Sequence, residues 1–288
     1  MNVLDLFAGI GGFALGLERA GHTVVGFCEI DPYCQAVLKK QWPKVPCFPD
    51  VRELARRTGD NEPEDEDNYV ECTIHRGQDF GECPCIGTDQ LIDTIGPVDV
   101  LCGGFPCEDI SLIGRQAGIE RGERSGLWSE FARIIGELGP RIVIVENVTA
   151  LLGRDIGRVL GDLAEVGYDA EWHCIPASAV GAPHRRDRVW IVGHPSEQGL
   201  EGYARDVAPR TKRRRHKASA YRSVAAPSLR LAMAGAFASV EDVWAAEPSV
   251  GRVADGVPDW VDRLECLGDA VVPQIPEAIG RAISHAAL

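Results

Sequence analysis

The chain has 288 residues, 45% of them hydrophobic, which is enough for one large domain with a smaller appendage. No apolar run approaches the length of a membrane-spanning helix, so we expect a cytoplasmic protein, with no membrane contact, whose ten scattered cysteines stay reduced. The net charge of −13 argues at first against a polyanionic partner, but the charge is uneven: residues 60–67 are acidic, whereas 205–222 form a basic stretch.

Short apolar runs alternate with amphipathic segments along most of the chain. The runs predict strands at 3–7, 23–28, 98–102, 142–145, 170–175 and 189–192, and the amphipathic segments predict helices at 13–20, 32–41, 127–138, 156–166 and 273–286. This alternation predicts an α/β fold, a doubly wound and mostly parallel sheet with helices on both faces.

Two segments interrupt this rhythm and divide the chain. Residues 59–89 are acidic, rich in Gly and Pro, and predict an inserted surface loop. Residues 194–258 lose the alternation and carry the basic stretch, which predicts a small separate lobe. The sheet domain would therefore span 1–193, and 259–288 would return to it.

One cysteine has a distinctive setting, because Cys107 follows Gly103-Gly104-Phe105-Pro106 directly after the predicted strand 98–102. A turn at the carboxyl end of a strand projects side chains into the crevice where open α/β sheets bind ligands, and proline restricts the backbone there. The thiol suits a nucleophile. An ordinary loop with a buried cysteine explains this fragment equally well.

A glycine-rich turn separates the first predicted strand from the first helix. Gly9, Gly11 and Gly12 allow a tight turn and close approach to a ligand, and Glu29 at the end of the next strand could accept both ribose hydroxyl protons. These features predict a nucleoside cofactor. Asp5 would repel a pyrophosphate but could receive an ammonium group. The pattern also matches a loose dinucleotide motif, so a nicotinamide enzyme and an empty turn stay open.

Six sequence blocks, taken in order, resemble the signature of the DNA (cytosine-5)-methyltransferase family of bacterial or bacteriophage type. They lie at 5–12, 29–31, 104–107, 146–148, 186–188 and 268–273. The resemblance implies a Rossmann-like, S-adenosylmethionine-dependent methyltransferase domain at 1–193. It also implies a target recognition domain at 194–258 and a C-terminal segment at 259–288 that completes the cofactor pocket.

The resemblance also implies roles for individual residues. Cys107 would attack carbon 6 of a cytosine in duplex DNA, Glu146 would hydrogen-bond the ring, and Arg186 and Arg188 would hold the extruded base and the adjacent phosphate. The implied S-adenosylmethionine-binding residues are Asp5, Phe7, Ala8, Gly9, Gly11, Gly12, Glu29, Ile30, Asp50, Val51, Pro106, Asp269 and Val271.

Contacts with double-stranded DNA are expected from a loop at 114–126 and from the basic lobe. The implied DNA-binding residues are Ser111, Arg115, Arg124, Arg213, Arg214 and Arg215. We expect a monomer, and the resemblance to enzymes of restriction-modification systems suggests a cognate restriction endonuclease as a further partner.

Three positions depart from the usual family pattern: Glu108 and His184 replace glutamines, and Asp269 replaces an asparagine. The change at Asp269 removes a hydrogen-bond donor and adds a charge near the base pocket. A catalytically weakened DNA-binding homologue therefore stays open as an alternative, as does an RNA cytosine methyltransferase of related design.

Four donors in the insert could hold a metal ion, namely Cys72, His75, Cys83 and Cys85. Three thiols and an imidazole suffice for a tetrahedral zinc site. Their irregular spacing favours a loop with incidental cysteines, so these residues are only a weak candidate for a zinc site.

Overall fold

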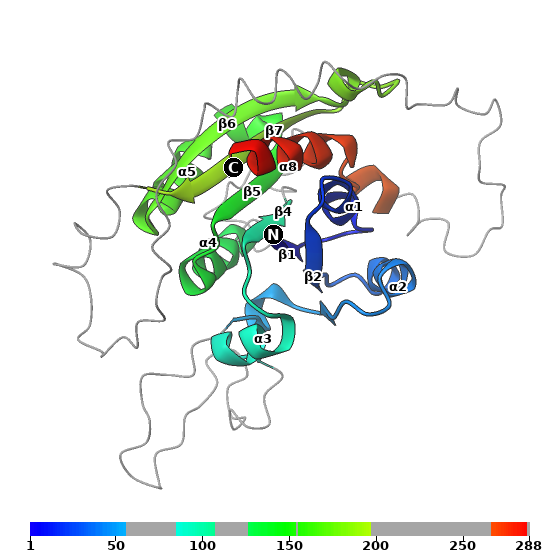
Figure 1. Ribbon diagram of the computed structural model, residues 1–288. Helices are drawn as coiled ribbons and strands as arrows, with labels where there is room; N and C mark the ends of the chain where they lie inside the picture. The colour runs from blue at the N-terminus through cyan, green and yellow to red at the C-terminus, as the bar shows by residue number, and fades with distance from the viewer. Residues whose placement is uncertain (56–84, 107–125, 154, 197–265, 287–288) are drawn as a thin grey trace, which may run out of the picture.

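The computed structural model describes residues 1–55, 85–106, 126–153, 155–196 and 266–286. In this part of the chain seven strands form one sheet, in the order β3-β2-β1-β4-β5-β7-β6 (Figure 1). The strands are β1 (Asn2–Leu6), β2 (Thr23–Cys28), β3 (Cys47–Phe48), β4 (Val100–Gly103), β5 (Ile142–Val148), β6 (Tyr168–Pro176) and β7 (Asp187–Pro195).

Strand direction explains where a functional site can form. The strands β1 to β5 pair in parallel, whereas β7 pairs antiparallel with both β5 and β6. The carboxyl ends of five parallel strands therefore meet at one edge of the sheet, and the first residues of β7 join them there. In open α/β sheets this edge is where ligands bind.

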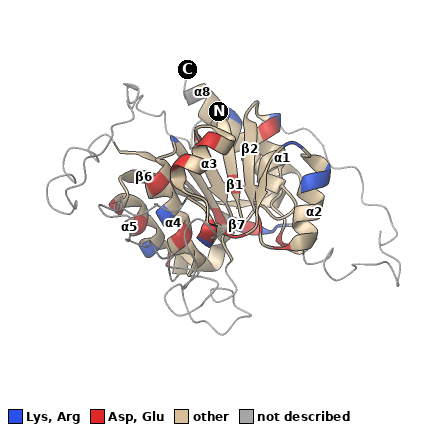
Figure 2. Ribbon diagram, turned by 90° about the horizontal axis from the view of Figure 1, so that it is seen from below, with Lys and Arg blue, Asp and Glu red and all other residues tan. Residues whose placement is uncertain are grey.

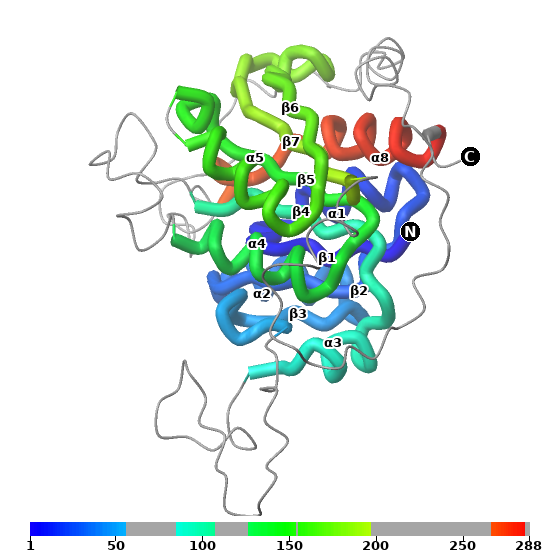
Figure 3. The backbone as a smooth tube through the Cα atoms, turned by 90° about the vertical axis from the view of Figure 1, so that its left-hand side faces the viewer, coloured from blue at the N-terminus to red at the C-terminus, as the bar shows by residue number. Residues whose placement is uncertain are grey.

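Helices cover both faces of the sheet (Figures 1 and 3). One face carries α1 (Gly12–Arg19), α2 (Pro32–Gln41) and α8 (Gln274–Ala286), and the other carries α3 (Thr88–Ile95), α4 (Leu127–Leu138) and α5 (Ile156–Glu165). Strand residues alternate between the two cores: Val3 belongs to the core under α1 and α8, whereas Leu4 belongs to the core under α3, α4 and α5. Short 3₁₀ turns occupy Val51–Glu53, Thr149–Gly153 and Ala177–Val180.

The C-terminal helix returns to lie beside the first helix, as Figures 1 and 3 show. Small residues permit this approach, because a Cβ at Gly280 would lie 2.8 Å from the Cβ of Ala20. The ring nitrogen Nε2 of His22 lies 3.1 Å from the carbonyl oxygen of Gly280. Residues from the two ends of the chain thus share one core.

The predicted fold class is confirmed: the sheet is mostly parallel, with helices on both faces. The helices expected at 32–41 and 127–138 have those bounds. The two-residue strand β3 was missed, and α3 begins at Thr88, inside the segment expected to be a loop. No helix separates β6 from β7, which form an antiparallel pair joined through a 3₁₀ turn.

The remaining domain boundaries stay predictions, because nearly all of 194–258 and most of 59–89 lie outside the described residues. The same holds for Cys72, His75 and Cys83, whereas Cys85 is described and buried. Among the described helices, none combines the length and the apolar character that crossing a membrane requires.

Candidate functional site

The sheet edge formed by the carboxyl ends of β1 to β5 brings together segments from five parts of the sequence. The turn after β1, Glu29 after β2, Asp50 after β3 and the Gly104–Pro106 segment after β4 all lie there. Glu146 belongs to β5 itself, near its carboxyl end. The predicted cofactor-binding and catalytic residues of the described segments therefore share one side of the molecule.

The turn after β1 has an unusual backbone. Phe7 has a φ of 53°, which costs energy for a residue with a side chain, and its ring lies 6.3 Å from that of Phe131. Gly9 and Gly11 also have positive φ values, 53° and 87°. A Cβ at Gly11 would lie 2.6 Å from the ring of Trp42, so this position requires glycine on two grounds.

Glu29 holds this turn from the neighbouring strand. Its Oε2 accepts a hydrogen bond from the backbone N–H of Gly9 at 2.7 Å, and its Oε1 accepts one from the N–H of Asp31 at 2.8 Å. Burial raises the pKa of Glu29, while the two N–H donors oppose that shift. Next to it, the side chain of Ile30 is 66% exposed, which leaves an apolar surface beside the carboxylate.

Asp5 lies beneath the first turn of α1 rather than at the surface. Its carboxylate is fully buried, accepts from the N–H of Ala14, and has the thiol of Cys102 3.6 Å from its Oδ1. Burial raises the pKa of Asp5 well above its ordinary value. Its Oδ2 has no hydrogen-bond partner among the described residues. Asp5 supports the glycine turn from inside, and its predicted contact with an ammonium group stays a prediction.

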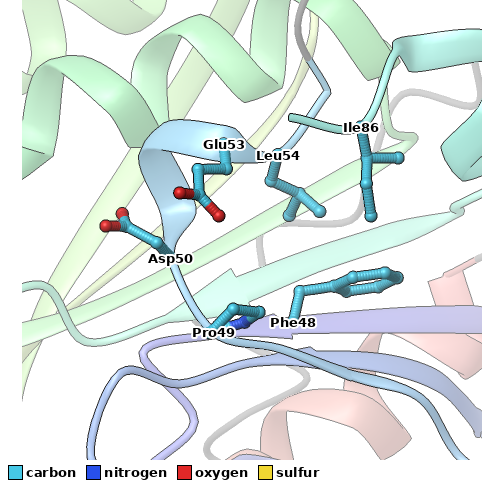
Figure 4. A pocket seen from close by; sticks show the side chains of 6 residues that line it. All are labelled: Phe48, Pro49, Asp50, Glu53, Leu54 and Ile86. Carbon is cyan, nitrogen blue, oxygen red and sulfur yellow. The ribbon is translucent and has the colours of Figure 1, made fainter. Parts of the chain in front are cut away.

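A small hollow lies beside the segment that follows β3 (Figure 4). Leu54 and Ile86 point toward the ring of Phe48, whereas the carboxylate of Asp50 points away from them (Figure 4). Asp50 pairs with Arg52, whose Nη2 lies 2.6 Å from its Oδ2. Val51, the other predicted adenine contact, is buried at the start of the 3₁₀ turn.

Arg133 of α4 fastens the chain just beyond this hollow. Its guanidinium donates to the carbonyl oxygens of Leu54 at 2.7 Å and Ala55 at 2.8 Å. Ala55 has a φ of 51°, so these bonds hold a strained residue in place. Sequence reasoning missed Arg133, because nothing local indicates that a helix 78 positions further along would reach this turn.

Two contacts hold the segment after β4, residues 104–106, in position. The ring of Phe105 lies 5.3 Å from that of Trp128, and the Nδ2 of Asn147 donates to the carbonyl oxygen of Phe105 at 3.1 Å. These contacts fix the chain up to Pro106. The next residue, Cys107, lies outside the described residues. Asn147 lies in the sequence block 146–148, but the sequence indicates a role only for Glu146.

Glu146 is buried at the centre of this edge. The Nε of Arg188 lies 3.0 Å from its Oε1, and a Cβ at Gly104 would lie 2.9 Å from its Oε2. Burial raises the pKa of Glu146 to about 7, although Arg188 and Arg186 lower it, and the charge of Asp269 raises it further. A carboxyl group that titrates near neutrality can donate or accept a proton at working pH.

Arg186, whose charge acts on Glu146, also binds the C-terminal segment. It has a φ of 36°, and its Nη1 donates to the carbonyl oxygen of Gly268. Asp269 is exposed beside this contact, and a Cβ at Gly12 would overlap with the carbonyl oxygen of Val271. The structure therefore brings the predicted residues Arg186, Asp269 and Val271 to the same edge as the glycine turn.

The predicted DNA contacts are not part of the described structure. Ser111, Arg115, Arg124, Arg213, Arg214 and Arg215 lie outside the described residues. Among the helices that are described, α3, α4 and α5 all carry acidic residues (Figure 2).

A mostly parallel sheet with a glycine turn after β1 and a carboxylate after β2 defines a Rossmann-like α/β protein. The family model for the C-5 cytosine-specific DNA methylase matches residues 1–67 and 73–242. This match covers most of the chain, so the chain belongs to the C-5 cytosine-specific DNA methylase family. The predicted family is thereby confirmed, and the match includes five of the six sequence blocks, all but the one at 268–273.

Three curated relatives show the same relationship. The type II methyltransferase M.Eco47II from Escherichia coli is 34% identical over 66% of this chain and 39% of its own length. M2.BsuMI from Bacillus subtilis is 31% identical over 67% of this chain and 41% of its own. M.HhaI from Haemophilus parahaemolyticus is 28% identical over 70% and 52%. The chain thus spans about half, or less, of the curated relatives it matches.

Proposed function

We propose that this protein transfers a methyl group from S-adenosylmethionine to carbon 5 of cytosine in a specific sequence of double-stranded DNA. Membership of the methylase family supports the reaction class, and the relatives are named type II methyltransferases. One observation carries the proposal: a buried carboxyl group with a pKa of about 7, Glu146, borders the Gly104–Pro106 segment that leads into Cys107.

The residues at the sheet edge fit S-adenosylmethionine. A Cβ at Gly9 would meet nothing within 4 Å, so this glycine leaves room for a ligand against the backbone, and the carboxylate of Glu29 suits the two hydroxyls of a ribose. Ile30 and the turn at Asp50–Val51 would hold the adenine. When bound, S-adenosylmethionine supplies an electrophilic methyl group on a sulfonium.

The chain's own residues would activate the base. The cytosine must leave the stacked duplex, at a cost of a few kcal/mol, before any side chain can reach carbon 6. The thiolate of Cys107 would add to carbon 6, which makes carbon 5 nucleophilic. Protonated Glu146 would donate to ring nitrogen 3 and stabilise the charge that develops there, while Arg188 orients it.

Product release reverses the covalent step. After carbon 5 accepts the methyl group, its proton leaves to a base, and the electron pair of that bond re-forms the double bond as the thiolate of Cys107 departs. Ring nitrogen 3 returns its proton to Glu146, so the protein ends unchanged. The products are S-adenosylhomocysteine, 5-methylcytosine in DNA and one proton.

Transfer of tritium from labelled S-adenosylmethionine to duplex DNA tests the proposal. We expect label in the DNA with the wild-type protein, none above background with Cys107→Ser, and a large loss with Glu146→Gln. Equal labelling by the wild type and Cys107→Ser would refute the covalent mechanism. Bisulfite sequencing of DNA from an expressing cell would then identify the methylated sequence.

One observation favours a second candidate, a weakened homologue that binds DNA. Asp269 places an additional negative charge at the edge that would receive the base. Such a protein would bind a duplex but form no covalent adduct with DNA containing 5-fluorocytosine, which an active enzyme traps. Competition between tRNA and duplex DNA in the transfer assay separates an RNA methyltransferase from both.

We further propose that the protein acts in the cytoplasm as a monomer, beside a cognate restriction endonuclease. The names of the relatives, type II methyltransferases, support the link to a nuclease. Sedimentation of the purified chain would test the monomer, and a nuclease gene adjacent to this one would support the pairing.

A further inference from the structure

Two cysteines from distant parts of the sequence meet beside the glycine turn. Cys34 lies in the first turn of α2, and Cys266 lies at the start of the described C-terminal segment, 232 positions later. Their sulfur atoms are 2.7 Å apart. Cys34 is buried, with 4% of its surface exposed, whereas Cys266 is half-buried.

This separation is informative because nonbonded heavy atoms pack at about 3.5–4.0 Å, whereas bonded sulfur atoms lie about 2.05 Å apart. The two thiols are already well inside the ordinary contact distance, so little movement separates them from a bond. We propose that Cys34 and Cys266 form a redox-reversible disulfide that fastens the C-terminal segment to α2.

A metal ion fits this pair less well. Asp31 completes a group of three donors, with its Oδ1 3.9 Å from the sulfur of Cys266. Two thiolates that bind one tetrahedral zinc at about 2.3 Å must stand about 3.8 Å apart, which the sulfur atoms do not. The Oδ1 of Asp31 also has a structural task, because it accepts the N–H of Cys34 at 2.8 Å and caps α2.

The order of the chemical steps follows from exposure. Burial and the neighbouring thiol raise the pKa of Cys34, so Cys266 at the more accessible position would react first. Its thiolate attacks one sulfur of a small-molecule disulfide, such as oxidised glutathione, and releases one thiolate. Cys34 then loses its proton and attacks the sulfur of Cys266, which releases the second thiolate. Two protein thiols are oxidised and one small disulfide is reduced to two thiols.

The bond would act on the edge that holds the predicted cofactor site. Cys266 and Leu267 line a hollow with Ile10, which lies in the glycine turn. Fixing Cys266 to α2 therefore restrains the stretch that leads to Asp269 and Val271. The bond would also close a loop of more than two hundred residues, which restricts the unfolded chain strongly. This inference does not depend on the proposed reaction.

The experiment uses the full chain, incubated with an excess of oxidised or reduced glutathione. After alkylation of the remaining free thiols and proteolysis, we expect a peptide pair linked through Cys34 and Cys266 only in the oxidised sample. The melting temperature of the oxidised protein should rise by about 5 °C or more. Dithiothreitol should reverse both changes.

Variants separate the bond from other effects of oxidation. Cys34→Ala and Cys266→Ala should each lose the linked peptide and the rise in melting temperature, whereas Cys174→Ser, which removes an exposed thiol elsewhere, should retain both. A linked peptide that forms only in urea would overturn the proposal. Full alkylation of both cysteines after oxidation would do so as well, and so would a gain in melting temperature with Zn²⁺ but not with oxidised glutathione.

Discussion

The guanidinium of Arg188 and the carboxyl group of Glu146 form an ion pair at the sheet edge, with Nε and Oε1 3.0 Å apart. The antiparallel pairing of β5 with β7 produces this contact, because it sets Arg188 opposite Val148, two residues from Glu146. The pair is largely buried, with 11% of the Glu146 side chain exposed. Burial outweighs the attraction of the arginine, since the pKa of Glu146 still rises to about 7.

This raised pKa predicts that Glu146 makes folding depend on pH. The unfolded carboxyl group titrates at its ordinary pKa of 4.5, so between there and about 7 only the folded state keeps the proton. The stabilisation from this proton is complete below pH 4.5 and is lost as pH rises through about 7, by on the order of 3 kcal/mol at most. Urea unfolding at several pH values measures this loss.

A glutamine at this position cannot titrate, so Glu146→Gln should flatten the decline in stability over that range. Glu165→Gln, at an exposed position on α5, is the matched control and should leave the decline unchanged. Parallel pH profiles for the wild type and Glu146→Gln would show that another group is responsible.

The carboxylate of Asp269 should affect the pKa of Glu146. Its negative charge raises the pKa of Glu146, so Asp269→Asn should lower that pKa and move the alkaline limb of methyl transfer to lower pH. Carbon-13 NMR of labelled glutamate carboxyls measures the shift directly in the free protein, with Glu146→Gln to assign the signal. This readout holds even if the protein transfers no methyl group.

The control for Asp269→Asn is Asp93→Asn, which removes the same charge at an exposed position on α3. Asp93→Asn should leave the pKa of Glu146 unchanged. If Asp269→Asn also leaves that pKa unchanged, the carboxylate at 269 has no electrostatic role, and the departure from the family's asparagine would need another explanation.

The sequence predicted most of the fold because the signals were local. Periodicity located the strands and helices, and the order of motifs located the edge where Gly9, Glu29 and Glu146 gather. The strand β3 was not predicted because two residues carry no periodicity, and it is defined only by the pairing of Cys47 and Phe48 with Phe27 and Cys28. The antiparallel direction of β7 could not be predicted either, because an alternating hydrophobic pattern is the same for a parallel and an antiparallel strand.

The supporting contacts of the site could not be predicted for a related reason. The thiol of Cys102 near Asp5, the amide of Asn147 at Phe105 and the sulfur pair of Cys34 and Cys266 all join residues distant in the sequence. Each depends on how distant elements pack against one another, which one sequence does not specify. Local sequence patterns therefore indicated the candidate site residues, and the fold shows which contacts hold those residues in position.

Asn147 is expected to position the segment that leads to Cys107. It is 2% exposed, its Nδ2 donates to the carbonyl oxygen of Phe105, and its Oδ1 accepts the N–H of Val148. Asn147→Asp keeps the shape but removes the donor and sets a buried carboxyl group against that carbonyl oxygen, and should cost at least about 1–3 kcal/mol of unfolding free energy. Because the segment that leads to Cys107 would be held less firmly, the rate of methyl transfer should fall by a larger factor than the affinity for S-adenosylmethionine.

Urea unfolding and single-turnover transfer measure the two effects of Asn147→Asp. Gln35→Glu is a useful comparison, since its amide also donates to a backbone oxygen, that of Glu29, at 2.7 Å, but on the cofactor side of the edge. That variant should weaken S-adenosylmethionine binding more than the covalent step. The reverse order of effects in the two variants would contradict the assignment of Asn147 to the Cys107 segment.

Two glycines with nearly the same backbone conformation allow the glycine turn to be tested. Gly11 has a φ of 87° and Gly21 a φ of 88°, but a Cβ at Gly21 meets nothing within 4 Å, whereas one at Gly11 meets the ring of Trp42. That ring cannot yield freely, because it packs on Phe27 and its Nε1 donates to Glu18 at 2.9 Å. Gly21→Ala should therefore cost about 1–2 kcal/mol from backbone strain alone.

Gly11→Ala carries the same backbone strain and adds a steric collision worth a further 1–3 kcal/mol or so. The collision would move the turn that is proposed to face S-adenosylmethionine, so the dissociation constant measured by calorimetry should rise at least about tenfold. Gly21→Ala should bind the ligand as the wild type does, because Gly21 lies beyond the other end of α1. Equal losses of stability and unchanged binding in both variants would mean that Trp42 yields and that the turn does not contact the ligand.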